Sequence, residues 1–357
     1  LEDDSMNRVP FSKSEIENGG VYDAGTSRAY PRFQTPISPL ENWQRALRHE
    51  KPLWAPMRMD CLNFLPRCIP DNVARVFVLD GNPPVNETGG NDMFGVEWVY
   101  VPIARGSMVR PGKPLLEDIS DWKNVIQFPD IEKWDWAHSA EISRDYRNTD
   151  RILEGWHFTG FFERLISFMD FENAAVALID EEQQEDVHEL FQALTDLYKK
   201  IIRKQKEYFN INMLFFHDDW GGQASPFFSL ETCRTMLVPY FKQIIQCCHE
   251  NDILFNFHNC GKNEKLFPAI VEMGADSWSG QAINDKLMLR EKYGDKVMIG
   301  ITHPLTEEST DEEVEEYAQW YMETFWPDMQ ERPVYLDETR PHPRLRKRLY
   351  ELSRMAE

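Results

Sequence analysis

The chain has 357 residues, of which 42% are hydrophobic, so it can bury the core of one α/β barrel or of two ordinary domains. Its formal net charge of −21 repels phosphate backbones and anionic lipid headgroups, which argues against nucleic-acid and membrane partners. No window approaches the roughly 18 uninterrupted apolar residues of a membrane span, and residues 1–30 contain no signal-type apolar stretch. We therefore expect a cytoplasmic protein whose six cysteines stay reduced.

The first half of the chain has weak periodicity. Short apolar runs at residues 54–59 and 74–79 predict strands. Residues 80–150 are rich in Pro, Gly and Trp, and we interpret this stretch as an irregular, lid-like insertion.

The second half alternates helical patterns with short apolar runs. Apolar residues recur at steps of three and four over residues 181–209, which predicts one long helix with a buried stripe. Strands are predicted at 213–216, 253–257, 275–278, 297–301 and 334–336. Helices are predicted at 230–249, with Ser229 as N-cap, and at 263–273, 283–293, 311–325 and 341–355. Five strands, each followed by a helix, indicate an α/β fold and most of a (β/α)₈ barrel. We assign residues 46–357 to this barrel and residues 1–45 to an N-terminal extension.

His258 and Cys260 follow a predicted buried strand, where barrel enzymes place their active sites. Because residues i and i+2 of a strand point to the same side, the two side chains can chelate one metal ion. The alternative is that His258 is a hydrogen-bonded core histidine and Cys260 a small buried apolar residue.

Three titratable residues, His217, Asp218 and Asp219, follow the apolar run at 213–216. Charged groups at a strand end need solvent, a metal or one another, because an unpaired buried charge is costly. Strand alternation puts His217 and Asp219 on one side and Asp218 on the other. Either aspartate could instead cap the following turn.

Several motifs resemble those of uroporphyrinogen decarboxylase-like proteins. HDDWGGQ at 217–223, PFFSLE at 226–231 and FHNCG at 257–261 resemble the HDDxGxQ, FxSPE and HxCG stretches of that superfamily. Further similar stretches are WAPMR at 54–58, FLP at 64–66, DMFGVEW at 92–98 and GFFE at 160–163. The resemblance covers roughly residues 42–336 and implies a (β/α)₈ TIM barrel.

Decarboxylation of a porphyrinogen is disfavoured. True uroporphyrinogen decarboxylases need an RxxxR pattern to hold substrate propionates, whereas this chain has Leu62 four residues after Arg58. An apolar side chain cannot pair with a carboxylate, and Asp60 would repel one.

The HxC turn instead resembles the zinc motif of the corrinoid-dependent methyltransferase branch, which includes methylcobalamin:coenzyme M methyltransferases and O-demethylase methyltransferases. The resemblance implies His258 and Cys260 as zinc ligands and Asp218 or Asp219 as acid, base or substrate orienter. His217 would support these residues without contacting the metal itself.

This branch usually supplies a third ligand as a cysteine near the last barrel strand, but no cysteine follows Cys260. We expect Glu338 to complete the site, with Asp337 and His303 as the alternatives.

The resemblance implies that the chain demethylates a small-molecule methyl donor, for example an aryl methyl ether, and passes the methyl group to a corrinoid (cobalamin). A separate corrinoid-binding protein would carry this cofactor, because the chain lacks a DxHxxG motif: Phe191 stands where the glycine is needed after Asp186 and His188. Alternatives are methyl transfer from a methyl-corrinoid to a thiol or tetrahydrofolate, and a non-catalytic binding subunit. Four aromatic residues could line a flat apolar substrate pocket: Trp98, Trp156, Phe161 and Phe162.

Overall fold

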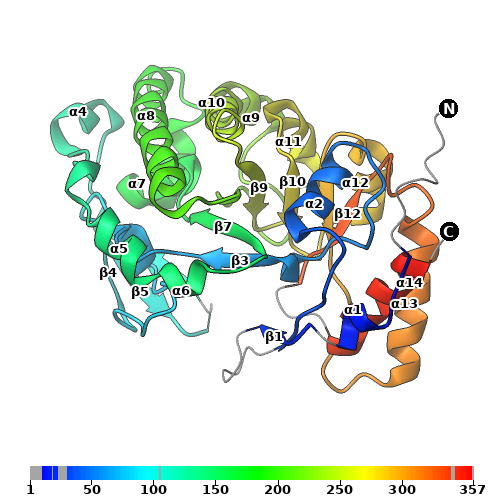
Figure 1. The fold of residues 1–357 in the computed structure, drawn as a ribbon. Coiled ribbons are helices and arrows are strands. Elements are labelled where there is room, and N and C mark those ends of the chain that lie inside the picture. The colour runs from blue at the N-terminus through cyan, green and yellow to red at the C-terminus, as the bar shows by residue number, and fades with distance from the viewer. Residues whose placement is uncertain (1–9, 18, 23–29, 104–105, 339–341, 356–357) are drawn as a thin grey trace. The chain divides into compact units, whose positions relative to one another are not determined.

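The computed structural model describes residues 10–17, 19–22, 30–103, 106–338 and 342–355 (Figure 1). Its largest sheet is curled and parallel, with seven strands in the order β12-β11-β10-β9-β8-β7-β3. These strands are β3 (Cys61–Phe64), β7 (Ile152–His157), β8 (Met213–His217), β9 (Leu254–Asn259), β10 (Ser277–Gly280), β11 (Met298–Ile301) and β12 (Val334–Leu336). The predicted α/β class is confirmed, and the sheet is consistent with a (β/α)₈ barrel.

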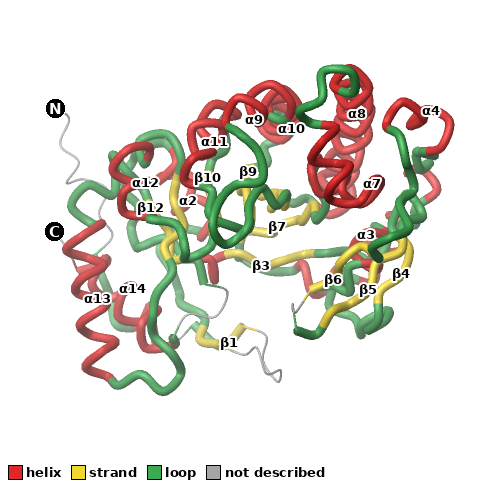
Figure 2. The backbone as a smooth tube through the Cα atoms, turned by 180° about the vertical axis from the view of Figure 1, so that it is seen from behind, coloured by secondary structure: helices red, strands yellow, loops and turns green. Residues whose placement is uncertain are grey.

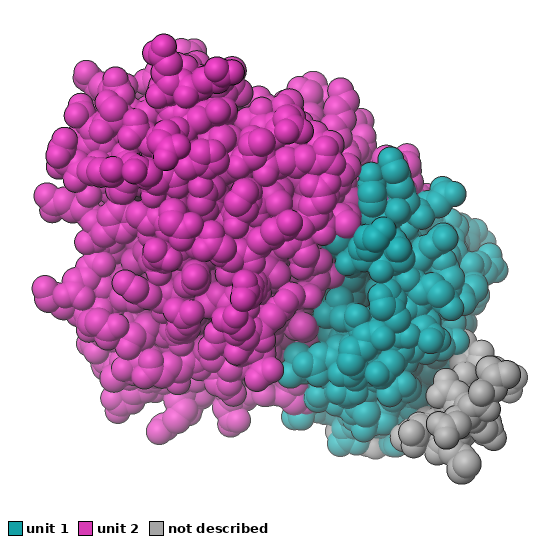
Figure 3. Space-filling view, turned by 90° about the horizontal axis from the view of Figure 1, so that it is seen from above, with its two compact units in different colours: residues 1–61, 290–357 teal, residues 62–289 magenta. Residues whose placement is uncertain are grey.

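Contacts divide the chain into two compact units, residues 1–61 with 290–357 and residues 62–289 (Figure 3). The first, which we call the terminal unit, holds β11, β12, α1 (Ser14–Glu17), β1 (Val21–Tyr22), β2 (Tyr30–Pro31), α2 (Pro39–Leu47), α13 (Asp311–Phe325) and α14 (Pro343–Met355). Helix α12 (Lys286–Tyr293) spans the division. The predicted strand at 334–336 and the predicted helix at 311–325 are confirmed to the residue.

The second unit, which we call the central unit, contains β7 to β10 and the longer run of helices. Its helices are α3 (Pro70–Ala74), α4 (Trp122–Val125), α5 (Trp136–Ile142), α6 (Arg144–Arg147), α7 (Phe161–Ala177), α8 (Gln184–Phe209), α9 (Leu230–Met236), α10 (Val238–His249) and α11 (Phe267–Met273). Helices α7 to α11 cover one side of strands β7 and β9 (Figure 2).

The long helix predicted at 181–209 is confirmed as α8. Its apolar stripe is buried, with Leu190, Phe191, Leu194 and Tyr198 all fully inaccessible to solvent. Burying each side chain of this size contributes roughly 1.5–3 kcal/mol, so the stripe holds α8 against the unit's core.

The single helix predicted at 230–249 is wrong, because the chain forms two helices that break at Leu237. Pro239 lies in the first turn of α10 and has no backbone N–H to donate, so it begins a new helix instead of continuing α9. The predicted N-cap is confirmed: the Ser229 hydroxyl accepts a hydrogen bond from the Thr232 backbone N–H over 3.0 Å.

The two strands predicted in the first half are also wrong. Within residues 54–59, only Met57 pairs, in an isolated parallel bridge to Leu336, and a 3₁₀ turn follows at Arg58–Asp60. In residues 74–79, Val76 has a positive φ of 61°, which interrupts any extended run. The local apolar pattern could not distinguish these turns from strands, since both bury the same side chains.

Residues 80–150 contain more regular structure than the sequence predicted. Strands β4 (Gly89–Asn91), β5 (Glu97–Val101) and β6 (Gly106–Val109) form an antiparallel sheet in which Trp98 pairs with Val109. In the part of the chain that the structure describes, no helix is both long and apolar enough to cross a bilayer.

Candidate metal centre

The ends of two neighbouring strands bring the predicted ligand motifs together. His217, the last residue of β8, pairs in register with His258 of β9, and their rings stack with centroids 5.0 Å apart. Gly261 has a φ of 94° and packs so closely on the Gly221 backbone that a Cβ there would collide with it. The loops after β8 and β9 therefore lie directly against each other.

Four side chains meet at this edge: His217, Asp219, His258 and Cys260. One ligand atom from each lies within 4.8 Å of the others. The Cys260 Sγ lies 3.5 Å from the His258 Nε2, and the His217 Nε2 lies 3.5 Å from an Asp219 carboxylate oxygen. Zinc bonds of 2.0–2.3 Å in a tetrahedron separate the ligand atoms by about 3.4 Å, so these spacings suit zinc. We call these four residues the floor cluster.

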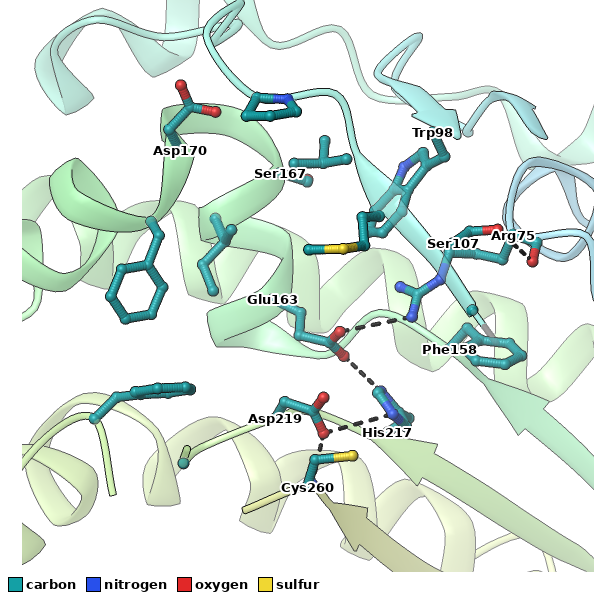
Figure 4. A pocket seen from close by; sticks show the side chains of 18 of the residues that line it. Arg75, Trp98, Ser107, Phe158, Glu163, Ser167, Asp170, His217, Asp219 and Cys260 are labelled. Atoms are coloured by element: carbon teal, nitrogen blue, oxygen red, sulfur yellow. Dashed lines mark hydrogen bonds and ion pairs between the residues drawn. The ribbon is translucent and has the colours of Figure 1, made fainter. Parts of the chain in front are cut away.

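Glu163 orients the His217 ring. Its carboxylate lies 2.6 Å from the His217 Nδ1, which leaves the Nε2 directed at Asp219 and Cys260 (Figure 4). The Arg75 guanidinium pairs with the other Glu163 oxygen over 3.6 Å. A carboxylate that holds the far nitrogen of a ligating histidine is the usual support of a metal ligand.

The electrostatics of the floor cluster favour a bound cation. Burial lowers the pKa of His217, but the carboxylates of Glu163 and Asp219 outweigh it and raise that pKa well above 6.5. Burial raises the pKa of Asp219, yet His217 and His258 hold it below its usual range. Burial also raises the pKa of the Cys260 thiol. The two carboxylates therefore favour a positive charge at His217, and a metal ion bound by this ring would take the place of a proton.

A cavity of about 910 Å³ opens above the floor cluster. Residues of the antiparallel sheet cover it from the far side, and we call these the roof: Trp98, Ser107, Met108 and Val109. Aromatic side chains make up much of the remaining wall, namely Phe77, Phe158, Phe171 and Phe227. The cavity therefore joins a polar, metal-ligating floor to an aromatic wall, which is the usual composition of a small-molecule site.

Comparison with known families agrees with this geometry. Residues 162–332 match the protein-family model described as "Uroporphyrinogen decarboxylase (URO-D)". This segment is similar to uroporphyrinogen decarboxylases. The match supports a place in that enzyme superfamily, and the matched segment contains the whole floor cluster and Glu163.

Comparison with solved structures adds three weak similarities. The catalytic domain of a GH26 endo-β-1,4-mannanase from Bacillus sp. JAMB-750 is 10% identical, with 89% of this chain and 91% of that chain covered and a TM-score of 0.40. A sugar phosphate isomerase/epimerase from Parabacteroides distasonis is 9% identical, with 68% and 82% covered and a TM-score of 0.35. An AP endonuclease of family 2 from Brucella melitensis is 9% identical, with 63% and 86% covered and a TM-score of 0.34. No curated protein matches the sequence. None of these similarities bears on the chemistry of the chain.

Asp218 faces away from the cavity. Its carboxylate accepts hydrogen bonds from the backbone N–H groups of Phe162 and Glu163 and from the Trp220 indole. It therefore caps the N-terminus of α7, and a Cβ at Gly160 would collide with it. Burial raises the pKa of Asp218 to about 7, against these three donors. The predicted alternation is confirmed, whereas the catalytic role proposed for Asp218 stays a prediction.

The sequence predicts three candidates for the third ligand. Glu338, Asp337 and His303 belong to the terminal unit, and none of them is in the group of four. His217 and Asp219 join His258 and Cys260 in this group, so His217, which the sequence predicts to support the ligands, lies among the candidate ligands. A ligand role for Glu338 stays a prediction.

Of the aromatic residues predicted to line a pocket, Trp98 is confirmed. Phe161 and Phe162 are fully buried in the core, and Trp156 stacks on Phe215 with ring centroids 4.0 Å apart. The Asp60 carboxylate accepts hydrogen bonds from the Trp54 indole and from the Met57 backbone N–H.

The sequence pattern did not single out Glu163 or Arg75 as site residues. Glu163 belongs to the GFFE stretch, which begins α7 just after β7 and so brings the side chain to the same sheet edge as His217. That strand-to-helix position was a usable signal. Arg75 follows a five-residue helix and carries no such signal, because only the fold places its guanidinium over the Trp98 ring at 4.3 Å.

Proposed function

We propose that the chain is a zinc-dependent methyltransferase that demethylates a small methylated substrate, for example an aryl methyl ether. The methyl group would pass to the cobalt of a corrinoid on a separate protein in the cytoplasm. The observation that carries the proposal is the floor cluster beneath an aromatic-walled cavity. Two imidazoles, a thiolate and a carboxylate form a donor set that suits zinc. Six cysteines without a disulfide are compatible with a reducing compartment.

The chain's own residues would divide the work. His217, His258 and Cys260 would hold the ion, and Glu163 would keep the His217 Nε2 pointed at it. Asp219 accepts the Cys260 backbone N–H over 2.6 Å, which holds its carboxylate beside the cavity. A catalytic zinc keeps one position open to substrate, and Asp219, which lines the cavity, would be the ligand that the substrate replaces.

Zinc, when bound, supplies a Lewis acid that weakens the bond between oxygen and a methyl group. The proposed reaction breaks this O–CH₃ bond and forms a cobalt–carbon bond. The reduced corrinoid of the partner protein would supply the electron pair of the new bond as a co-substrate, and the leaving oxygen would keep the old pair and take a proton from solvent. The aromatic wall of the cavity would hold a flat substrate over the floor cluster.

The charges of the cavity also argue against porphyrinogen decarboxylation. Several substrate carboxylates would need basic partners, and Arg75 is the one arginine or lysine on the cavity wall among the described residues. Its guanidinium already pairs with Glu163 and donates to the Thr159 hydroxyl.

The test combines metal analysis with a spectroscopic assay. We expect about one zinc per chain by mass spectrometry, and conversion of free reduced cobalamin to methylcobalamin when guaiacol is the methyl donor. His258→Ala should lose both, whereas the matched control His249→Ala, on the outer side of α10 beside Asp276, should lose neither. Absence of zinc from the purified protein would reject the mechanism. Loss of the cobalt-bound methyl group only on addition of a thiol would show the reverse reaction.

A further inference from the structure

Helix α7 breaks inside the cavity wall. Asp170 has φ 61° and ψ 168°. Residues other than glycine rarely adopt this conformation, because it is energetically unfavourable for a residue with a Cβ. Its carboxylate accepts the Gly112 backbone N–H over 3.1 Å, which ties the break to the segment after β6. Strain of this kind, held in place by a specific contact at a cavity wall, commonly accompanies function.

The break changes which side chains reach the cavity. In a regular helix only residues three or four apart share a face, yet Asp170, Phe171, Glu172 and Asn173 all line the cavity. Phe171 is 43% exposed and packs edge-on against Phe227, with ring centroids 4.9 Å apart. The outer part of the cavity therefore presents aromatic rings and two carboxylates together. We call Asp170 and Glu172 the acidic rim.

No positive side chain of the described cavity wall balances the acidic rim. The guanidinium of Arg75 is held between the rings of Trp98 and Phe158, at 4.3 and 4.7 Å from their centroids, and is paired with Glu163. Figure 4 shows Arg75 beside Glu163 and Trp98, with Asp170 on the opposite side of the cavity. At the floor, the Cys260 thiolate and the Asp219 carboxylate would balance the two charges of a zinc ion. The negative charge of the rim thus remains whether or not the metal is bound.

We propose that the cavity accepts methylated aromatic compounds that carry a positive charge, such as a protonated amine, and that the acidic rim selects them against carboxylates. Aromatic faces attract cations through their quadrupole, and nearby carboxylates add a direct attraction. The same carboxylates would repel an anionic substrate, and no unpaired cation of the described cavity wall would offset this repulsion. This inference names the substrate class of the proposed methyltransferase and rests on that function.

The test uses one scaffold in three charge states. Guaiacol is neutral, vanillylamine carries a protonated amine and vanillate carries a carboxylate, while all three share the same methoxyphenol. We expect calorimetry on the zinc-loaded protein, without corrinoid, to give the tightest binding for vanillylamine and the weakest for vanillate. Two partly exposed carboxylates predict a difference on the order of tenfold, which should shrink as salt is raised.

The double variant Asp170→Asn with Glu172→Gln should remove this preference. Asn tolerates positive φ better than most residues and keeps an oxygen that can accept the Gly112 N–H, so the local fold should be preserved. The neutral compound guaiacol serves as the control and should bind the double variant as tightly as it binds the original protein. Tighter binding of vanillate, no binding of vanillylamine, or an unchanged preference in the double variant would overturn the inference. If vanillylamine is preferred but none of the three compounds methylates cobalamin, the substrate class stands and the proposed reaction fails.

Discussion

The floor cluster and the roof of the cavity are held by different means. The floor side chains leave the ends of two parallel strands whose register pairs His217 with His258. The roof depends on buried charge: the Trp98 indole donates to Asp92 over 2.9 Å, and Asp92 pairs with Arg164 over 2.5 Å. Adjacent residues of α7 serve the two regions, since Glu163 holds His217 and Arg164 holds Asp92. The floor cluster thus lies at the ends of strands, while the roof belongs to a separate antiparallel sheet that one helix holds in place.

The largest effect should come from breaking the floor. Cys260→Ala removes the sulfur ligand, and we expect the zinc affinity to fall by more than about 100-fold, beyond what loss of a supporting residue costs. Competition with a chromogenic chelator measures this affinity. Cys68→Ala is the matched control, because Cys68 is also half-buried and lies outside the cluster. Equal zinc affinity in the two variants would remove Cys260 from the ligand set.

The next largest effect should come from removing the buried ion pairs that hold the roof. Arg164 is fully buried and pairs with both Asp71 and Asp92, so Arg164→Leu leaves two buried carboxylates without their cation. We expect the free energy of unfolding in urea to fall by about 3–5 kcal/mol. Arg234→Leu, which breaks a surface pair with Glu272, should change it little. A similar small loss in both would mean that the roof is held by packing alone.

A smaller effect should distinguish Glu163, which holds His217, from other carboxylates of α7. Glu163→Gln keeps the shape of the side chain but weakens the support of His217, and we expect zinc affinity to fall about 10- to 100-fold. Glu172→Gln is the control, since it makes the same change on the same helix away from the floor. Zinc titrations of both variants decide the point, and an unaltered affinity in Glu163→Gln would show that Glu163 does not orient the ligand.

The smallest effect concerns a second histidine at a strand end. His157 closes β7 but packs against Phe216 and Tyr198 in the core, and burial, with a contribution from Arg164, lowers its pKa to about 3. Between pH 3 and 6.5 only the unfolded chain protonates this group, so its contribution to stability is complete above pH 6.5 and is lost as pH falls. The expected slope is about 1.4 kcal/mol per pH unit. Urea unfolding at pH 7 and 5 should show a flatter dependence in His157→Gln; an identical slope would contradict the assignment.

Much of the floor could be predicted from the sequence. Apolar runs ending in HDD and HNC placed both motifs at strand ends, and the period of two separated Asp219 from Asp218. The full ligand group could not be predicted, since the closeness of His217 to Cys260 depends on β8 and β9 being neighbours in register. The sequence resemblance predicts Glu338 as the third ligand, whereas the side chains that lie close to His258 and Cys260 in the structure are His217 and Asp219.

The sequence by itself determined the α/β class, the helix α8 and the gathering of potential metal ligands at the strand ends, because these follow from local periodicity and residue type. Only the tertiary structure decided the roof, the support of His217 by Glu163 and the turn at Asp170. Each of these depends on at least one contact between residues about 50 or more positions apart, as the pair of Gly112 and Asp170 illustrates. Ion pairs and hydrogen bonds between residues so far apart produce no repeating pattern in the sequence. They can therefore be recognised only in the folded structure, where the partners lie together.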